Sequence, residues 1–234
     1  MNKRHSLGQH FLISSQVAHS IVDLVGIKRG DVILEVGTGK GILTPHLCAR
    51  AKKVISIEKD PGLYREAKKA FGGVKNLALE QGDAFERDGV EFDVFVSNLP
   101  YSESRNAIEW LAQRRFSHAV VMVQKEFAQK LFSKGGGCRR AVTVIASYCM
   151  DMEELMDVTK TSFQPPPKVD SVVLSLKQKR TLSKDLIAAV NTLFSFRRKT
   201  IRNIARKFGL VVDSDKRIDD LSDSEIIDLA RKIA

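Results

Sequence analysis

Four consecutive residues, Asn98-Leu99-Pro100-Tyr101, combine groups that can handle an aromatic amine. The Asn98 amide oxygen and the Leu99 carbonyl are hydrogen-bond acceptors, while Pro100 fixes the turn and offers no competing N–H. Acceptors that hold the hydrogens of an exocyclic amine out of the ring plane localise the nitrogen lone pair and aim it at an electrophilic carbon. Tyr101 adds a ring on which a purine can stack. The corner therefore predicts alkyl transfer to a purine amine; a strand stopped by proline is the alternative.

A glycine-rich segment from Glu35 to Gly41 closes one predicted strand and opens a helix. Gly37, Gly39 and Gly41 permit a tight turn and the close approach of a ligand to the backbone. Their G-x-G-x-G spacing differs from the G-x-G-x-x-G of dinucleotide sites and argues against a nicotinamide cofactor. We expect Glu35 and the three glycines to contact a cofactor; a glycine turn without a ligand is the alternative.

Acidic residues also follow the next two predicted strands, Glu58 after the first and Asp83 after the second. Open α/β sheets bind ligands at the carboxyl ends of their strands. The Glu58 carboxylate can accept both hydroxyls of a ribose, and Asp83 is placed to accept from an adenine amine. Either residue alone is more often a solvated charge, but together with the glycine segment they fit an adenosyl ligand. A sulfonium methyl donor would be activated already, so no catalytic histidine is required.

Short apolar runs alternate with helical stretches through the first half of the chain. An amphipathic helix is predicted to end at Gly26, after an extended arm from Ser6 to Leu12. Strands are predicted over 32–37, 54–58, 76–83, 92–98 and 118–123, and helices near 41–50, 62–70 and 108–111. This alternation predicts an α/β fold, with a mostly parallel, Rossmann-like sheet wound on both faces.

The pattern changes after residue 137. The runs 141–150, 156–161 and 171–176 read as strands without intervening helices, which predicts an antiparallel hairpin at the end of the sheet. From Ser183 onward the pattern is helical. We therefore expect one domain over residues 1–179 and a small all-helical domain over 180–234.

The charge of the chain is unevenly distributed. Its 234 residues carry a formal net charge of +10, which favours an anionic partner. Residues 177–207 hold ten basic residues and one acidic residue, whereas residues 208–234 are net negative. We expect Arg198, Arg202 and Arg206 to form an i,i+4 row of cations facing phosphates, with Arg197 and Lys199 beside them. A solvated helix face is the alternative.

Other classes of protein fit the sequence less well. The three cysteines lack C-x-x-C spacing and the five histidines form no H-x-x-x-H pair, so no metal site is expected. Neither a signal-peptide core nor a membrane span is evident. We expect a reducing, cytoplasmic location, no membrane partner and a monomeric state.

Several motifs occur in one order and together resemble a known family. They are Leu7–Leu12, Glu35–Gly41, Ile57-Glu58, Gly82-Asp83-Ala84, Asn98–Tyr101, Phe163–Ser171 and Phe196–Asn203. This ordered set resembles the KsgA family of ribosomal RNA adenine dimethyltransferases, and the likeness runs from residue 7 to about residue 206.

The resemblance implies a class I methyltransferase domain that uses S-adenosylmethionine, followed by a helical domain that contacts RNA or the ribosome. The usual product is two adjacent dimethyladenosines near the 3′ end of small-subunit ribosomal RNA, a step in subunit maturation. The positions that match the family's cofactor contacts are His10, Leu12, Gly37, Glu58, Asp83 and Asn98, and we expect Ala84, next to Asp83, to contact the cofactor as well. The target base would lie between Tyr101 and Phe163. The family most often has Asn at position 10, and Ser102–Arg105 also departs from its pattern.

Three other functions fit the sequence less well. Tyr64-x-x-x-Lys68 has the spacing of a reductase catalytic pair, but it follows the second predicted strand and is better explained as a helix surface. A ribosome-assembly or RNA-binding factor without catalysis would not need the Asn98–Tyr101 corner. An adenine methyltransferase acting on large-subunit RNA or DNA fits the 7–12 and 165–171 segments less well.

Overall fold

The computed structural model describes residues 10–234, so positions 6–9 of the predicted arm lie outside the described residues. Its main sheet has seven strands in the order β4-β3-β2-β5-β6-β9-β7. The strands are β1 (Phe11–Leu12), β2 (Val32–Val36), β3 (Lys53–Glu58), β4 (Leu77–Gln81), β5 (Val94–Asn98), β6 (His118–Gln124), β7 (Met150–Val158), β8 (Phe163–Gln164) and β9 (Ser171–Gln178). The α-helices are α1 (Ser15–Val25), α2 (Thr44–Cys48), α3 (Pro61–Phe71), α4 (Ser104–Leu111), α5 (Lys125–Leu131), α6 (Ala141–Cys149), α7 (Lys184–Ser195), α8 (Ile201–Lys207) and α9 (Asp223–Arg231).

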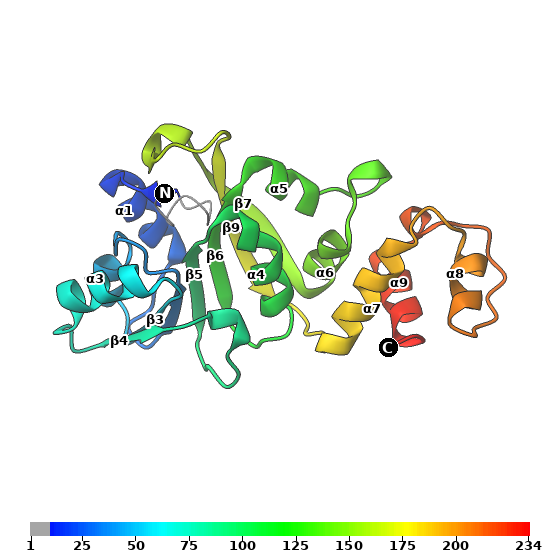
Figure 1. Cartoon of the computed structure of the whole chain (residues 1–234), viewed down its shortest axis with the longest axis horizontal. Coiled ribbons are helices and arrows are strands. Elements are labelled where there is room, and N and C mark those ends of the chain that lie inside the picture. Colours follow the sequence, from blue (N-terminus) through cyan, green and yellow to red (C-terminus); the bar gives the residue numbers. More distant parts are fainter. Residues whose placement is uncertain (1–9) are drawn as a thin grey trace. The chain divides into compact units, whose positions relative to one another are not determined.

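The sheet is parallel from β4 through β6 and then changes direction. β2 pairs in parallel with β3 and β5, while β9 runs antiparallel to β6. Figure 1 shows these strands side by side with helices on both sides. The predicted α/β class is thus confirmed, including the antiparallel end of the sheet and the helical C-terminal region.

One strand prediction is wrong. Residues 141–149 form helix α6, and the strand begins only at Met150. Seven of the nine helical residues are buried, so the apolar run shows no amphipathic period. A short, wholly buried run cannot be assigned to helix or strand by periodicity. The predicted 156–161 strand overlaps only the end of β7, and Lys160–Ser162 form a 3-10 turn.

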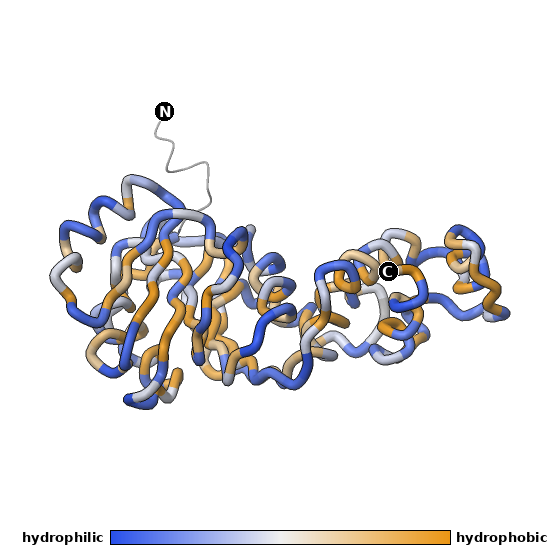
Figure 2. Tube along the Cα trace, turned by 90° about the horizontal axis from the view of Figure 1, so that it is seen from below, coloured by the Kyte–Doolittle hydropathy of each residue, from blue (hydrophilic) through white to orange (hydrophobic). Residues whose placement is uncertain are grey.

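Below the site, a hydrophobic core lies between one face of the sheet and helices α1 and α2. On β5 and β6, alternate residues point to this core, since side chains two apart share a face of a strand. They are Val94, Val96, Val120 and Met122. Figure 2 shows hydrophobic residues concentrated along these central strands. Helix α1 starts at the Ser14 cap and ends at Gly26, whose φ of 65° closes the helix in the left-handed region.

The chain divides into two compact units. The first runs through Asn106 and adds residues 115–125 and 152–177, so it carries most of the sheet and helices α1, α2 and α3. The second comprises residues 107–114, 126–151 and 178–234. The expected boundary at 179 lies close to the last crossing between units, and its assignment as a domain limit stays a prediction. No helix within residues 10–234 is long and apolar enough to cross a membrane.

Candidate functional site

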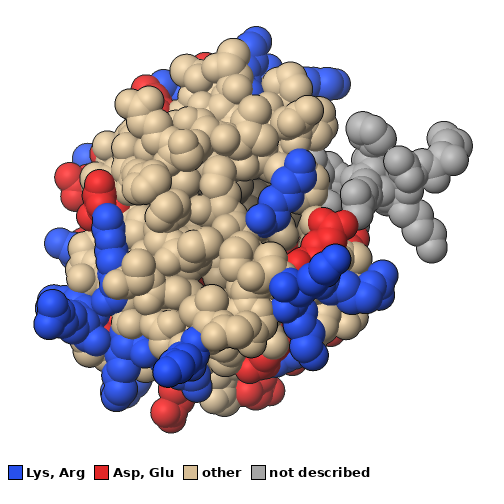
Figure 3. Space-filling model, turned by 90° about the vertical axis from the view of Figure 1, so that its left-hand side faces the viewer, with Lys and Arg blue, Asp and Glu red and all other residues tan. Residues whose placement is uncertain are grey.

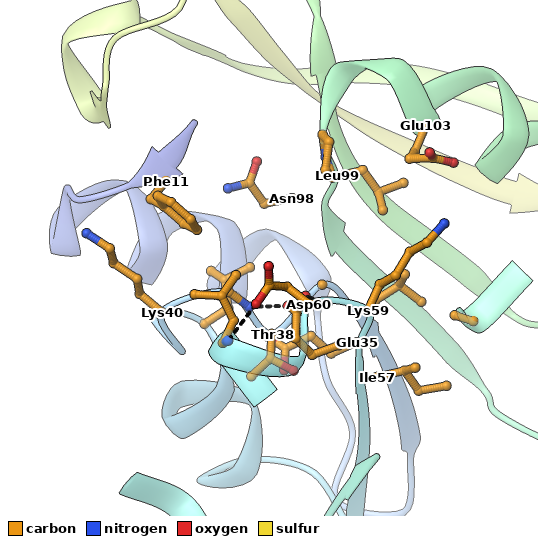
Figure 4. Close-up of a pocket in the computed structure, with 18 of the residues that line it drawn as sticks. Phe11, Glu35, Thr38, Lys40, Ile57, Lys59, Asp60, Asn98, Leu99 and Glu103 are labelled. Carbon is orange, nitrogen blue, oxygen red and sulfur yellow. Dashed lines mark hydrogen bonds between the residues drawn. The ribbon is translucent and has the colours of Figure 1, made fainter. Parts of the chain in front are cut away.

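A pocket of about 250 Å³ lies at the carboxyl ends of the parallel strands. Figure 4 shows Phe11, Lys40 and Asn98 toward one end of it and Lys59, Leu99 and Glu103 toward the other. The lining includes these residues singled out from the sequence: His10, Leu12, Glu35, Gly37, Gly39, Glu58, Asp83, Ala84, Asn98, Leu99 and Pro100. The topology thus brings together groups from five separate segments.

The glycine segment and Glu58 are joined by hydrogen bonds. The backbone N–H of Gly39 donates to Oε2 of Glu58 at 2.8 Å, and the N–H of Asp60 donates to Oε1 at 2.8 Å. Gly37 and Gly39 have φ values of 84° and 58°, a region that favours glycine. Glu58 is only 4% exposed, and burial raises the pKa of its carboxyl above the usual range. Its two oxygens each keep a further lone pair for a ligand.

Gly41 has a different role from the other glycines. It does not line the pocket, and a Cβ at this position would lie 2.2 Å from the ring of Phe71 in α3. Its φ of 74° is also in the left-handed region. The absence of a side chain at Gly41 therefore allows α3 to pack against the loop; cofactor contact at this residue stays a prediction.

Glu35 lies beneath the loop in a network of hydroxyl groups. Its Oε2 accepts hydrogen bonds from Thr44 Oγ1 at 2.8 Å and from Ser56 Oγ at 2.6 Å. Thr38 Oγ1 lies 2.6 Å from Ser56 Oγ, and because the Ser56 hydrogen points to Glu35, Thr38 is the donor in that bond. Glu35 is 1% exposed, and burial raises the pKa of its carboxyl to about 7, although the two hydroxyl donors oppose the rise.

Asp83 is held at the mouth of the pocket. Its Oδ1 accepts from the backbone N–H of Phe85 at 2.9 Å, and its Oδ2 accepts from Lys59 Nζ at 2.7 Å. Burial alone would raise the pKa of this carboxyl, but the bonds from Lys59 and Phe85 leave it below the usual value. Asp83 is therefore a stable anionic acceptor beside the backbone of Ala84.

Asn98 ends β5 and points into the pocket (Figure 4). Within residues 10–234 neither its side-chain amide nor the Leu99 carbonyl has a hydrogen-bond partner. Pro100 and the 3-10 turn Tyr101–Glu103 then lead the chain away from the sheet. The corner thus presents two open acceptors to the pocket.

Tyr101 lies behind this corner and does not itself line the pocket. Its hydroxyl is 2.8 Å from Ser171 Oγ, and its ring centroid is 5.6 Å from that of His10. His10, which does line the pocket, donates from Nδ1 to the Pro165 carbonyl at 2.8 Å. The predicted stacking residue is therefore adjacent to the pocket and firmly held.

Phe163 is not brought to the pocket. It is 3% exposed, belongs to the core and pairs with Leu12 across the short β1–β8 ladder. Its predicted stacking on the target base would need the ring to leave the core, and this role stays a prediction.

The comparisons with known proteins place this chain in a family. A sequence model described as ribosomal RNA adenine dimethylase matches residues 1–233. The chain belongs to this dimethylase family. Members similar to it include the ribosomal RNA small subunit methyltransferases A of Thermotoga neapolitana and Thermotoga maritima. The first is 36% identical over 97% of this chain and 90% of its own length, and the second is 32% identical over 98% and 85%.

Solved structures agree with the dimethylase assignment. A dimethyladenosine transferase from Plasmodium falciparum aligns with a TM-score of 0.78 at 28% identity, covering 94% of this chain and 96% of that chain. The 23S rRNA methyltransferase ErmE has a TM-score of 0.65 at 21% identity over 95% and 99%, and so shows the fold alone. As a member of the dimethylase family, the chain is a methyltransferase with a class I fold.

The basic segment of this dimethylase differs from its sequence prediction. Helix α8 begins at Ile201, so Arg198 precedes the helix and the expected i,i+4 row of three arginines is wrong. Arg202 forms ion pairs with Asp213 and Asp215, and Arg197 pairs with Asp219 at 2.6 Å. The sequence prediction placed the charge correctly but missed that acids from the net-negative C-terminal segment neutralise part of it.

Between residues 197 and 207, four cations have no acidic partner in the described part of the chain. They are Arg198, Lys199, Arg206 and Lys207. The two lysines lie over the Phe196 ring, with Nζ at 5.7 Å and 5.2 Å from its centroid. On the face drawn in Figure 3, by contrast, Lys and Arg lie around the margin with acids among them and a mainly uncharged centre. An unneutralised cluster beside an aromatic ring is therefore a feature of the helical C-terminal segment.

Several polar residues of the site were missed from the sequence. Ser56 and Thr44 hold Glu35, and Lys59 holds Asp83. A signal existed for Ser56, because a hydroxyl inside the apolar strand VISIE must find a buried partner. Lys59 is adjacent to Glu58 in sequence, but its partner Asp83 follows another strand, β4, and no local pattern indicates that contact.

Proposed function

We propose that this protein transfers methyl groups from S-adenosylmethionine to N6 of two adjacent adenosines near the 3′ end of small-subunit ribosomal RNA, and that this modification contributes to subunit maturation. The observation that carries the proposal is the pair of unpartnered acceptors, on Asn98 and Leu99, at the edge of a pocket that also holds Glu58 and Asp83. Family membership and relatives named small subunit methyltransferase A support it.

The pocket residues fit S-adenosylmethionine by their chemistry. Glu58 retains lone pairs for ribose hydroxyls, and Asp83 is an anionic acceptor suited to an adenine amine. The left-handed glycines Gly37 and Gly39 leave backbone accessible beside them, while Ile57 and Leu99 supply apolar walls for the purine. When bound, the cofactor supplies an electrophilic methyl group on a sulfonium.

Asn98 and Leu99 orient the substrate amine. An adenine N6 amine is a weak nucleophile because its lone pair is delocalised into the ring. The Asn98 Oδ1 and the Leu99 carbonyl accept its two hydrogens and turn the lone pair out of the ring plane. The lone pair held by these two acceptors would attack the sulfonium methyl group that a bound cofactor supplies, with the thioether as leaving group, and the surplus N6 proton would leave to water. A monomethylated amine keeps one hydrogen, so one acceptor is enough to orient it for the second transfer.

The residues around Asn98 position the base. Pro100 has no N–H that would compete for the acceptors. The Tyr101 ring offers a face on which the adenine stacks, and base stacking on aromatic side chains contributes about 1–3 kcal/mol per base. An adenosine in a duplex would have to be unstacked first at a cost of a few kcal/mol, so loop or terminal adenosines are favoured.

The C-terminal helical segment supplies the RNA contacts. We assign phosphate binding to Arg198, Lys199, Arg206 and Lys207, which keep their charge unneutralised, with the Phe196 ring between the two lysines. Arg197 and Arg202, although equally basic, already serve acidic partners. Cations that displace counterions from RNA phosphates supply most of the salt-dependent affinity.

The protein is also inferred to act as a monomer in the cytoplasm. Its cysteines at 48, 138 and 149 are all free thiols, which fits a reducing compartment. Light scattering coupled to size exclusion tests the monomer directly: a mass near 26 kDa is expected, and a mass near twice that value contradicts it.

The function is tested by methyl transfer. The protein is incubated with radiolabelled S-adenosylmethionine and either immature small subunits or total RNA, and the labelled nucleotide is then mapped. Label on two adjacent adenosines near the 3′ end is expected. Label confined to large-subunit RNA would overturn the substrate assignment. A protein that binds the subunit but transfers no label would instead be an assembly factor.

A further inference from the structure

Tyr101 is fixed from two sides by residues that are distant in sequence. Its hydroxyl lies 2.8 Å from Ser171 Oγ at the start of β9, and its ring lies against His10 at 5.6 Å between centroids with a tilt of 33°. A tyrosine ring can otherwise turn about two side-chain bonds. A contact on the ring and another at its hydroxyl together restrict both rotations.

The two residues that hold Tyr101 are themselves tied to one turn. His10 donates from Nδ1 to the carbonyl of Pro165, the first residue of the 165–170 turn. Ser171, the first residue of β9, directly follows the same turn. The far side of the turn is anchored through Asp170, whose Oδ1 accepts from the backbone N–H of Lys160 at 2.8 Å. The contacts therefore form a closed circuit from His10 to Tyr101, Ser171, the turn and back to His10.

This circuit adjoins the amine-binding corner. Tyr101 is three residues from Asn98, and His10 lines the pocket together with Asn98 and Leu99. Stacking geometry and amine geometry are consequently coupled, since a purine stacked on Tyr101 must present N6 to the Asn98 and Leu99 acceptors. Displacement of a reacting group by about 1 Å can cost roughly 100-fold in rate.

We propose that His10 and Ser171 are positioning residues that set the plane of the Tyr101 ring, and thereby the angle at which the target adenine presents its amine. The inference rests on the proposed function and names two residues that control it.

The test compares variants that remove each contact with variants that retain it. Ser171→Ala and Tyr101→Phe remove the same hydrogen bond from opposite ends, while Ser171→Thr keeps the hydroxyl. For each variant, kcat and KM for small-subunit RNA, the Kd for S-adenosylmethionine and the melting temperature are measured. Each deletion is expected to lower kcat about tenfold, with cofactor Kd within about twofold of wild type. The double variant should be no slower than Tyr101→Phe alone, because both substitutions delete the shared hydrogen bond.

The ring contact is tested in the same way at His10. His10→Asn removes the ring and is expected to lower kcat about fivefold, whereas His10→Phe keeps a ring and should recover part of the loss. His19→Asn is the matched control, because His19 is exposed on α1 and contacts the Ser15 carbonyl and the His46 ring, neither of which lines the pocket. It should leave kcat unchanged.

The outcomes separate this inference from the proposed function. If wild type methylates the RNA while Ser171→Ala and Tyr101→Phe both keep kcat within about twofold, the positioning roles are wrong. Strictly additive losses in the double variant would also overturn them. Absence of transfer by the wild-type protein would instead contradict the proposed function.

Discussion

The Glu58 carboxylate accepts a hydrogen bond from the backbone N–H of Gly39 at 2.8 Å, which fixes the loop after β2 to the end of β3. The other carboxylate oxygen is bound by the N–H of Asp60 at the start of α3. One side chain therefore shapes three segments around the pocket before any ligand binds. The same carboxylate is the acceptor proposed for the ribose, so loop geometry and cofactor affinity depend on one residue.

Glu58→Gln should weaken cofactor binding more than it slows chemistry. The substituted amide nitrogen would face a backbone N–H, and the charged acceptor for the ribose would be lost. We expect the Kd for S-adenosylmethionine to rise at least about tenfold, equivalent to about 1.4 kcal/mol, with kcat at saturating cofactor within about threefold. Calorimetric titration measures the Kd, and an unchanged value would show that Glu58 does not contribute to cofactor binding.

Glu35 should make the stability of the protein depend on pH. Burial raises the pKa of its carboxyl from 4.5 to about 7 in the folded state. A raised folded pKa stabilises the protein fully below pH 4.5, and this contribution is lost as pH rises through about 7. Glu35→Gln does not titrate, so the stability of wild type relative to this variant should fall by about 3 kcal/mol between pH 4.5 and pH 8.

Urea unfolding of both proteins at several pH values measures this difference. Other titrating groups, including the histidines, are present in both proteins and cancel. A stability difference that is the same at pH 5 and pH 8 would show that Glu35 keeps its ordinary pKa when folded.

The unneutralised cations should dominate the salt dependence of RNA binding. Arg198→Gln together with Arg206→Gln should reduce the slope of log K against log salt by about 1.5, since each lost phosphate contact contributes about 0.7–0.9. The matched pair Arg197→Gln and Arg202→Gln removes the same charge from residues that serve Asp219, Asp213 and Asp215. We expect this second pair to change the slope by about half as much or less. Equal slopes for the two double variants would show that the cluster is an ordinary solvated surface.

Much of the site could be predicted from sequence because strand ends converge in a parallel sheet. Glu58, Asp83 and Asn98 each follow a short apolar run, and the topology alone places such residues at one edge. The sequence pattern could not predict which hydrogen bonds and ion pairs hold each of these side chains. The Lys59–Asp83 bond and the hydroxyls on Glu35 depend on side chains from other elements, which local spacing does not encode.

The errors have equally specific causes. Helix α6 was mistaken for a strand because it is buried nearly all round, which erases the period that separates the two structures. The arginine row failed because it assumed a helix through Arg198, whereas Thr200 caps α8 with its side chain and pairs with Arg217 across an isolated bridge. A Ser or Thr at this position is a helix-start signal. The burial of Phe163 depends on the Leu12 pairing, a contact between residues far apart in the chain.

The role proposed for Asn98, orienting the substrate amine, is tested most directly by one measurement. Asn98→Ala is compared with wild type in single-turnover methyl transfer to immature small subunits, at saturating S-adenosylmethionine and with RNA affinity measured in parallel. We expect the transfer rate to fall at least about 100-fold, of the order seen when one preorganised catalytic hydrogen bond is removed, while RNA affinity stays within about twofold. A transfer rate close to that of wild type would contradict the account.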